Sequence, residues 1–233
     1  MIGYDNHVIG HQCVLDLPFE EMTGLVTYCT GKTDIIATLG NGAGASNPAW
    51  AQLVSGIPYL EFDLAAPPDY VDAPAADTTG LDFTSGDFSM IVWVNADALT
   101  DRHVLMCKGL LNTRGWWFSV FTGGYITFEY YIPGYESVAS VVSIIVAGTW
   151  YLVGVSRTGT SMRIYRNGDD VTDVDPFTGN PVSSVNDDLN IGVIEDKASY
   201  PFDGSMHRPR AWDRYLQPWE HRMVYNMECG MFP

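Results

Sequence analysis

Along most of the chain, apolar and polar residues alternate with a period of two, and Gly, Pro, Asn and Asp interrupt the alternation at short intervals. A period of two places successive side chains on opposite faces, as in a half-buried strand. The runs that predict strands are 88–94, 115–122, 125–131, 162–166, 171–174, 189–193 and 206–212. The chain therefore reads as a series of short strands.

Two dipeptides mark hairpin turns between neighbouring runs. Gly123-Gly124 separates two of the predicted strands, and Asn167-Gly168 separates another two. Both dipeptides tolerate the positive φ angles that two-residue hairpin turns require. Short strands joined by such turns indicate a sandwich or barrel rather than alternating βαβ units. We therefore predict an all-β, antiparallel protein.

One uncharged stretch, residues 137–156, is long enough to be compared with a membrane span, which needs about 20 apolar residues. It is rich in β-branched residues, and Gly148-Thr149 interrupts it before a second apolar run begins at Trp150. We interpret it as two buried strands joined by a turn, and we predict no membrane insertion.

A single helix is predicted near the C-terminus. Pro218 suits the first turn of a helix and Gly230 suits its end. Its apolar positions are expected to face the sandwich; they are Trp219, Met223, Tyr225 and Met227.

The first twelve residues carry little pattern, so we predict an extended N-terminal arm over 1–12 and one domain over 13–233. No basic residue precedes Lys32 and no apolar core follows a charged start, so the sequence shows no cleavable signal peptide. We expect a soluble protein.

Charge is strongly lopsided, with 28 acidic residues against 12 basic ones and a formal net charge of −16. A surface of this sign repels phosphate backbones and anionic lipid headgroups. Nucleic acid is therefore not an expected partner.

Four cysteines, at positions 13, 29, 107 and 229, show no C-x-x-C spacing. Four cysteines permit three pairings, among which sequence cannot choose. Without an export signal, reduced and mostly buried thiols are the expected state.

The order of segments resembles the laminin-G-like jellyroll domains of the concanavalin A-like lectin/glucanase superfamily, over roughly residues 13–229. The matching segments are Leu15–Glu21, Leu60–Asp63, Asp69–Asp72, Leu81–Ser89, Val92–Val94, Lys108-Gly109, Gly148–Trp150, Arg163–Gly168, Phe202–Gly204 and Arg210–Arg214. The resemblance implies a jellyroll sandwich of two antiparallel sheets. Trp93 and Trp150, which lie among apolar neighbours, are expected to be buried core residues.

The superfamily includes glucanases, so the sequence must be tested for catalytic carboxylates. The resembling enzymes carry E-x-D-x-E on one strand, which places the carboxylates on one face. The nearest match here is Glu61-Phe62-Asp63-Leu64-Ala65, which lacks the last carboxylate. We interpret Glu61 and Asp63 as solvated acids at a strand end and predict no enzymatic activity, with a degenerate glucanase as a remote alternative.

Many members of the resembled family hold a structural calcium ion with aspartates of the penultimate strand. His207 and Arg208 stand at the two aspartate positions here, so the usual calcium site is in doubt and no cofactor is predicted. Pro209 further predicts that this strand is at a sheet edge or bulged. Two acidic segments, 169–175 and 186–188, are interpreted as solvated turns that do not bind a metal.

The best ligand candidate is one face of the hairpin over 115–131. Alternation places Tyr125, Glu129 and Tyr131 on the same face, with Trp117 and Tyr135 nearby. Flat aromatic rings combined with a carboxylate suit the apolar faces and hydroxyls of sugars. Packing against another subunit or the N-terminal arm is the open alternative.

The function implied by the resemblance is a non-enzymatic structural or attachment protein. Stand-alone chains of this type resemble proteins that decorate the particles of tailed bacteriophages, so virion localisation and partners among other virion subunits or further copies of the chain are expected. The alternative is a free lectin that binds surface glycans through the residues named above. A homo-oligomer or a place in a larger assembly is expected.

Overall fold

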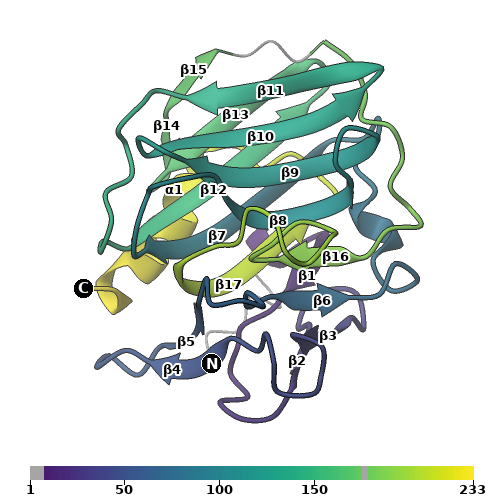
Figure 1. Ribbon diagram of the computed structural model, residues 1–233. Helices are drawn as coiled ribbons and strands as arrows, with labels where there is room; N and C mark the ends of the chain where they lie inside the picture. The colour runs from purple at the N-terminus through teal and green to yellow at the C-terminus, as the bar shows by residue number, and fades with distance from the viewer. Residues whose placement is uncertain (1–7, 175–177) are drawn as a thin grey trace.

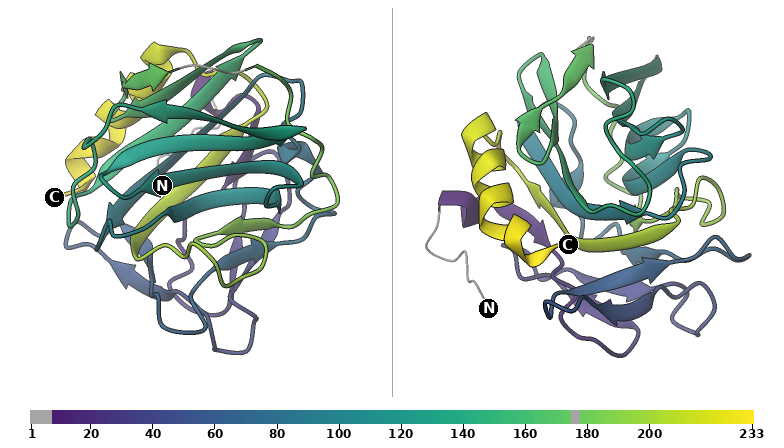
Figure 2. Two further views of the ribbon diagram at one scale, coloured as in Figure 1. Left: turned by 45° about the horizontal axis from the view of Figure 1, so that its top comes forward. Right: turned by 90° about the vertical axis from the view of Figure 1, so that its left-hand side faces the viewer.

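The computed structural model describes residues 8–174 and 178–233. Within these residues the strands form two antiparallel sheets, one of eight strands and one of nine, which face each other as layers (Figures 1 and 2). The eight-stranded sheet runs in the order β14 (Asp169–Asp170), β13 (Ser161–Arg166), β12 (Tyr151–Thr158), β7 (Phe88–Ala96), β17 (Gly204–Trp212), β5 (Pro58–Phe62) and β4 (Ala49–Gln52), with β1 (Cys13–Asp16) paired to β17. The nine-stranded sheet runs in the order β15 (Thr172–Val174), β11 (Gly134–Ser140), β10 (Tyr125–Ile132), β9 (Arg114–Phe121), β8 (His103–Leu110), β16 (Leu189–Ile191), β6 (Val71–Ala73), β3 (Ile36–Leu39) and β2 (Val26–Tyr28). Three short 3₁₀ turns lie at Val8–Gly10, Thr79–Leu81 and Cys229–Met231.

Aromatic side chains fill the space between the two sheets. Phe88 of the eight-stranded sheet contacts Phe128 of the nine-stranded sheet, with ring centroids 5.2 Å apart, and Phe83 stacks on Phe88 at 4.3 Å. Trp116 lies on the same side of β9 as Phe118, and both are fully buried. The predicted alternation and the predicted all-β jellyroll sandwich are confirmed.

Both predicted hairpin turns are present. Gly123-Gly124 joins β9 to β10, and Asn167-Gly168 joins β13 to β14. Asn167 and Gly168 have φ angles of 52° and 79°, as a type I′ turn requires. Gly168 also lies against the backbone of Arg222, where a Cβ atom would come within 2.6 Å of Cα.

The uncharged stretch 137–156 contributes to two strands, as predicted, but a loop over 141–150 rather than a turn joins them. β11 ends at Ser140, and β12 begins only at Tyr151. The loop between them passes under the β9–β10 turn, where Ile144 and Ile145 donate their N–H groups to the carbonyl of Gly124 and are buried. Val141, Val142 and Val146 of the same loop are exposed, so these β-branched residues lie in a loop rather than in a strand. Among the described residues, no helix is long and apolar enough to cross a membrane.

The predicted helix is α1 (Pro218–Glu228), and a capping box between Gln217 and Glu220 fixes its start. It packs on the outer side of the eight-stranded sheet, away from the nine-stranded sheet (Figure 2). The predicted inward face is wrong at Trp219, which is 55% exposed. Met223 and Tyr225 are partly buried and pack against the apolar cluster beneath the helix, as predicted. The fully buried positions are Glu220, His221, Val224 and Glu228.

Polar anchors explain why the helix turns this face inward. Glu228 accepts hydrogen bonds from Arg210 Nη1 at 2.7 Å and from Trp93 Nε1 at 2.7 Å, both on the eight-stranded sheet. Trp93 and Trp150 are buried, as expected, but in a second apolar cluster beneath the helix rather than between the sheets. These buried polar contacts fix the rotation of the helix together with its inward apolar residues.

The strand that carries Pro209 is central, because β17 lies between β7 and β5. The prediction of an edge strand is therefore wrong, and the alternative prediction of a bulge is confirmed. The register to β7 shifts between His207 and Arg210, and Arg208 adopts a φ of 51°. Proline is tolerated here because the bulge removes the ladder hydrogen bond that Pro209 cannot donate.

Part of the predicted N-terminal arm, residues 1–7, lies outside the described residues. Residues 8–12 contact the domain: Ile9 is buried, and its carbonyl accepts a hydrogen bond from Trp212 Nε1 at 2.7 Å. None of the four cysteines is in a disulfide; Cys13 and Cys107 are buried, and Cys29 and Cys229 are partly buried.

Candidate functional site

The outer face of the nine-stranded sheet carries the predicted ligand residues. Across β8, β9 and β10 the register places Cys107 opposite Trp117 and Trp117 opposite Glu129, so these three share the face that points away from the core. Tyr131 lies two residues further along β10 and pairs with Tyr135 of β11. Alternation in the sequence predicted this grouping correctly.

The group of five is a strip rather than a cluster. Tyr125 and Tyr131 lie at opposite ends of β10, which at ~3.3 Å per residue separates them by about 20 Å. Glu129 lies between them, and Tyr135 approaches it from β11. A ligand that contacts all the aromatic members must therefore be extended.

A buried carboxylate lies at the centre of this strip. Glu129 is only 3% exposed and forms an ion pair with Arg102, which precedes β8. The Tyr135 hydroxyl donates to the other oxygen of Glu129, and Arg102 Nε donates to Ser119 Oγ at 3.4 Å. Burial raises the pKa of Glu129 to about 7, although the Arg102 guanidinium opposes the rise.

Partly exposed aromatic rings surround the buried pair. Phe121 and Tyr125 stack across the β9–β10 hairpin with centroids 5.2 Å apart. The Arg102 guanidinium lies over Phe121 at 5.3 Å and over Tyr200 at 4.9 Å. Tyr135 is the most open member, with 43% of its surface exposed.

Trp117 is placed differently from the tyrosines. It is fully buried, because Ile194 and Tyr200 of the loop 192–203 pack over it on the outer side of the sheet. Its indole N–H donates to no acceptor among the described residues. Trp117 thus supports the strip from below, whereas Tyr125, Tyr131 and Tyr135 form its accessible surface.

Sequence reasoning missed two members of this site, Arg102 and Tyr200. Both come from loops, one just before β8 and the other before β17, and neither belongs to an alternating run. The only local signal was that Arg102 is one of the few cations in an acidic chain, which marks it as a candidate partner for a buried carboxylate.

The carboxylates tested as catalytic groups lie far from this arrangement in the fold. Glu61 and Asp63 are exposed at the end of β5, on the eight-stranded sheet. Glu61 accepts a hydrogen bond from the Tyr59 hydroxyl at 3.2 Å, and Asp63 accepts one from the backbone N–H of Ala65 at 2.8 Å. Their surroundings are those of solvated turn acids.

A serine–histidine pair does occur in the fold, between Ser156 and His221, with 2.6 Å between Oγ and Nε2. His221 is buried on the inward face of α1, and its ring stacks on that of Tyr165 with centroids 3.8 Å apart. Burial lowers the pKa of His221 to about 3. This pair connects α1 to the sheet and is closed to any substrate.

The position of the family calcium ligands is occupied by an ion pair. Arg208 Nε and Nη2 each donate to Asp16 at 2.8 Å, and His207 Nδ1 lies 2.6 Å from the Pro58 carbonyl oxygen. Burial lowers the pKa of His207 to about 4. Across residues 8–174 and 178–233, no group of three or more His, Cys, Asp or Glu side chains is arranged to hold a metal ion.

The two acidic segments differ from each other. Asp169 forms an ion pair with Arg222 of α1, and Asp175 lies outside the described residues. Asp187 is half-buried, because Arg114 Nε and Nη2 both donate to its carboxylate at 2.6 Å. The interpretation of 186–188 as a simply solvated turn is therefore wrong.

The profile of the concanavalin A-like lectin/glucanases superfamily matches residues 68–220, about two thirds of the chain. The chain belongs to the concanavalin A-like lectin/glucanases superfamily. The matched region of this superfamily member includes the whole aromatic strip. No curated protein matches the sequence.

Several solved structures are similar in fold to this superfamily member. The binding domain of botulinum neurotoxin serotype G aligns with a TM-score of 0.69 at 13% identity, over 93% of this chain and 51% of that one. Domain 4 of AbnA, a GH43 extracellular arabinanase from Geobacillus stearothermophilus, solved in complex with arabinotriose, aligns with a TM-score of 0.69 at 16% identity, over 92% of this chain and 98% of that one. This chain therefore spans about half the length of the toxin binding domain and nearly all of the arabinanase domain. At these identities the likeness shows the fold.

Proposed function

We propose that this protein is a non-enzymatic attachment module that binds an extended glycan along the outer face of its nine-stranded sheet. The observation that carries the proposal is the strip of partly exposed rings, Tyr125, Tyr131 and Tyr135, around the buried Arg102–Glu129 pair. Aromatic faces suit the apolar faces of sugar rings, and the buried pair holds the Tyr135 ring in place through the hydrogen bond from its hydroxyl to Glu129.

Two further observations support this class of function. One similar domain, that of the arabinanase, was solved in complex with arabinotriose, and a study of botulinum neurotoxin type C, 13% identical with a TM-score of 0.68, describes interaction with two ganglioside molecules. The exposed positions of Glu61 and Asp63 support a function without hydrolysis. Glu61 is bonded to Tyr59 of the same strand, and Asp63 is bonded to the backbone of Ala65 in the following turn. Retaining hydrolysis would need two carboxyl groups only about 5 Å apart, flanking the scissile bond.

A second candidate is attachment through protein contacts, as in a protein that decorates a bacteriophage virion. It is favoured by exposed apolar side chains at the open edge of the nine-stranded sheet, where Tyr28 of β2 pairs with Ile36 of β3. Such an edge suits another subunit better than a sugar.

A glycan array probed with the purified protein, once with calcium and once with chelator, tests the proposal. We expect saturable binding to a subset of glycans, and no loss with chelator, because Arg208 and Asp16 pair where the family calcium ligands would be. A folded protein that binds nothing on a broad array would contradict the proposal and favour the second candidate.

A further inference from the structure

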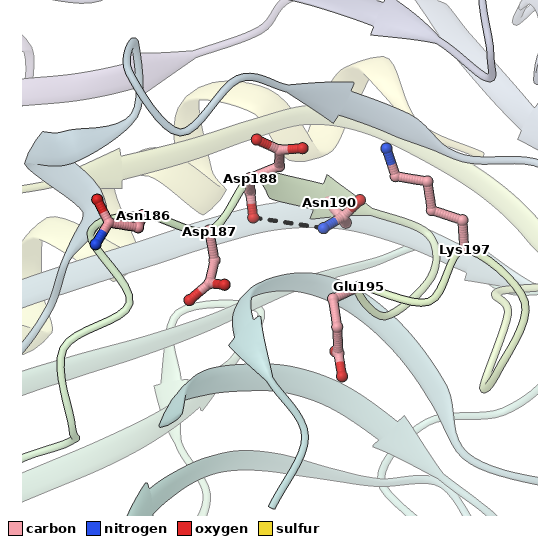
Figure 3. A pocket seen from close by; sticks show the side chains of 6 residues that line it. All are labelled: Asn186, Asp187, Asp188, Asn190, Glu195 and Lys197. Atoms are coloured by element: carbon pink, nitrogen blue, oxygen red, sulfur yellow. Dashed lines mark hydrogen bonds between the residues drawn. The ribbon is translucent and has the colours of Figure 1, made fainter. Parts of the chain in front are cut away.

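A pocket of about 270 Å³ lies beside β16, and its lining residues are Asn186, Asp187, Asp188, Asn190, Glu195 and Lys197. Figure 3 shows these side chains, which come from the segment before β16, from β16 itself and from the loop that follows it. The register places Asn190 opposite Cys107 of β8, so Asn190 belongs to the same row as Trp117 and Glu129. Three strand spacings of ~4.8 Å separate Asn190 from Glu129 along this row.

The charged groups around the pocket are held by the protein rather than left mobile. Arg114 binds Asp187, and Lys197 Nζ lies 2.7 Å from Asp72. Backbone N–H groups fix the two remaining carboxylates. The N–H of Ala75 donates to Asp188 at 2.8 Å, and that of Leu111 donates to Glu195 at 2.6 Å. The pocket is therefore preorganised.

Two buried acceptors of the pocket are left without a donor from the described residues. Asn190 is 1% exposed, and its Oδ1 accepts no hydrogen bond, although its Nδ2 lies 3.4 Å from the Asp188 carbonyl oxygen. Glu195 Oε2 is buried and equally unpartnered. Proteins rarely leave buried acceptors unpaired, so this arrangement points to a ligand that donates hydrogen bonds.

The charge balance defines the class of that ligand. Arg114 neutralises Asp187 and Asp72 neutralises Lys197, so the pocket offers mainly the acceptor oxygens of Asp188, Asn190 and Glu195, with the Lys197 ammonium as a donor. A divalent cation would prefer several free carboxylates, and it would meet Lys197 here. A hydroxyl both donates and accepts, and a volume slightly below the ~300 Å³ of common ligand pockets suits one small unit.

We infer that this pocket is a subsite for a single neutral sugar unit of the glycan that lies along the aromatic strip. The identity of the ligand as a glycan rests on the proposed function. The position of the subsite rests on the unpartnered acceptors Asn190 Oδ1 and Glu195 Oε2. It extends the binding surface from β11 across the loop 192–203 to β16.

The test is a titration of the isotope-labelled protein with free monosaccharides (arabinose, glucose, galactose and N-acetylglucosamine), followed by NMR. The backbone amides of Ala75 and Leu111 report on the pocket, because they donate to Asp188 and Glu195. We expect at least one monosaccharide to shift both amides, and the same sugar to bind at least tenfold more weakly to Glu195→Gln. This change keeps an oxygen for Leu111 and turns the unpartnered acceptor into a donor.

Glu20→Gln is the matched control, since it removes one exposed carboxylate that lines neither site. Asp188→Asn is a second variant that keeps an oxygen for the Ala75 amide, should Glu195→Gln fail to fold. Shifts confined to residues 125–135 would overturn the subsite while the proposed function stands. Shifts of the Ala75 and Leu111 amides with calcium chloride alone would overturn it in favour of a cation site. No shift of the Ala75 and Leu111 amides with any of the sugars would overturn the subsite, whatever the array shows. An empty glycan array would in addition overturn the proposed function.

Discussion

Glu129 is a buried carboxylate beneath the accessible rings of the strip, and two features of its environment shift its pKa in opposite directions. Burial disfavours its charged form, whereas the ion pair with Arg102 favours it. The outcome is a pKa of about 7, which places the titration of this group within the physiological range. The charge state of the centre of the strip therefore changes near neutral pH.

Because the pKa of Glu129 is raised in the folded protein, folding favours the protonated carboxyl. The stabilisation from this group is complete below its ordinary pKa of about 4.5 and is lost as the pH rises through about 7. Across that window the free energy of unfolding from this group should fall by about 1.4 kcal/mol per pH unit. We expect Glu129→Gln to lack this component, when urea unfolding of the variant and the wild type is compared at a series of pH values. Equal slopes in the two proteins would show that Glu129 titrates as an exposed acid.

At the residue scale, alternation was sufficient to place Trp117, Glu129 and Tyr131 on one face, because strand geometry alone determines it. It was not sufficient to show which of them a ligand reaches. Trp117 is covered by Ile194, more than seventy residues away in the sequence, and no local pattern records that contact. Arg102, the ion-pair partner of Glu129, was missed for the same reason, since it lies in a loop before β8 and not in an alternating run.

At the element scale, the hairpins were predictable because their turns carry the information within a few residues, as Asn167-Gly168 does with its two positive φ angles. The inward face of α1 was predictable only in part, because Met223 and Tyr225 do pack inward. The burial of Glu228 depends on its pair with Arg210 of a distant strand, which no local pattern shows. The loop after Ser140 was also not predictable, because its buried residues Ile144 and Ile145 donate their backbone N–H groups to the Gly124 carbonyl of a distant turn rather than to a neighbouring strand.

This account of the helix predicts that Glu228 is critical for stability. In Glu228→Gln the buried Arg210 guanidinium loses the carboxylate charge that it faces at 2.7 Å, which should lower the free energy of unfolding by about 3–5 kcal/mol in urea denaturation. Asp169→Asn is the matched control, because it removes the exposed ion pair between Asp169 of β14 and Arg222 of the same helix. This change should lower the free energy of unfolding by no more than about 1 kcal/mol. Similar losses in the two variants would mean that the buried pair does not orient the helix.

At the scale of the whole molecule, the two sheets have outer faces of different character. The helix α1 packs over the Trp93 cluster on the outer face of the eight-stranded sheet (Figure 2). The nine-stranded sheet instead carries partly exposed tyrosine rings on its own outer face. The net charge of −16 disfavours long anionic polymers and does not oppose a neutral glycan. A neutral glycan along the open face satisfies both properties.

The most direct test of this account is calorimetric titration of the strongest array glycan into the double variant Tyr125→Ala/Tyr131→Ala. Tyr28→Ala is the control, because Tyr28 is an exposed tyrosine of the same sheet on its far edge strand. We predict at least a tenfold loss of affinity in the double variant, with retained fold by circular dichroism, and unchanged affinity in the control. Unchanged affinity in both proteins would contradict the assignment of the aromatic strip as the binding surface.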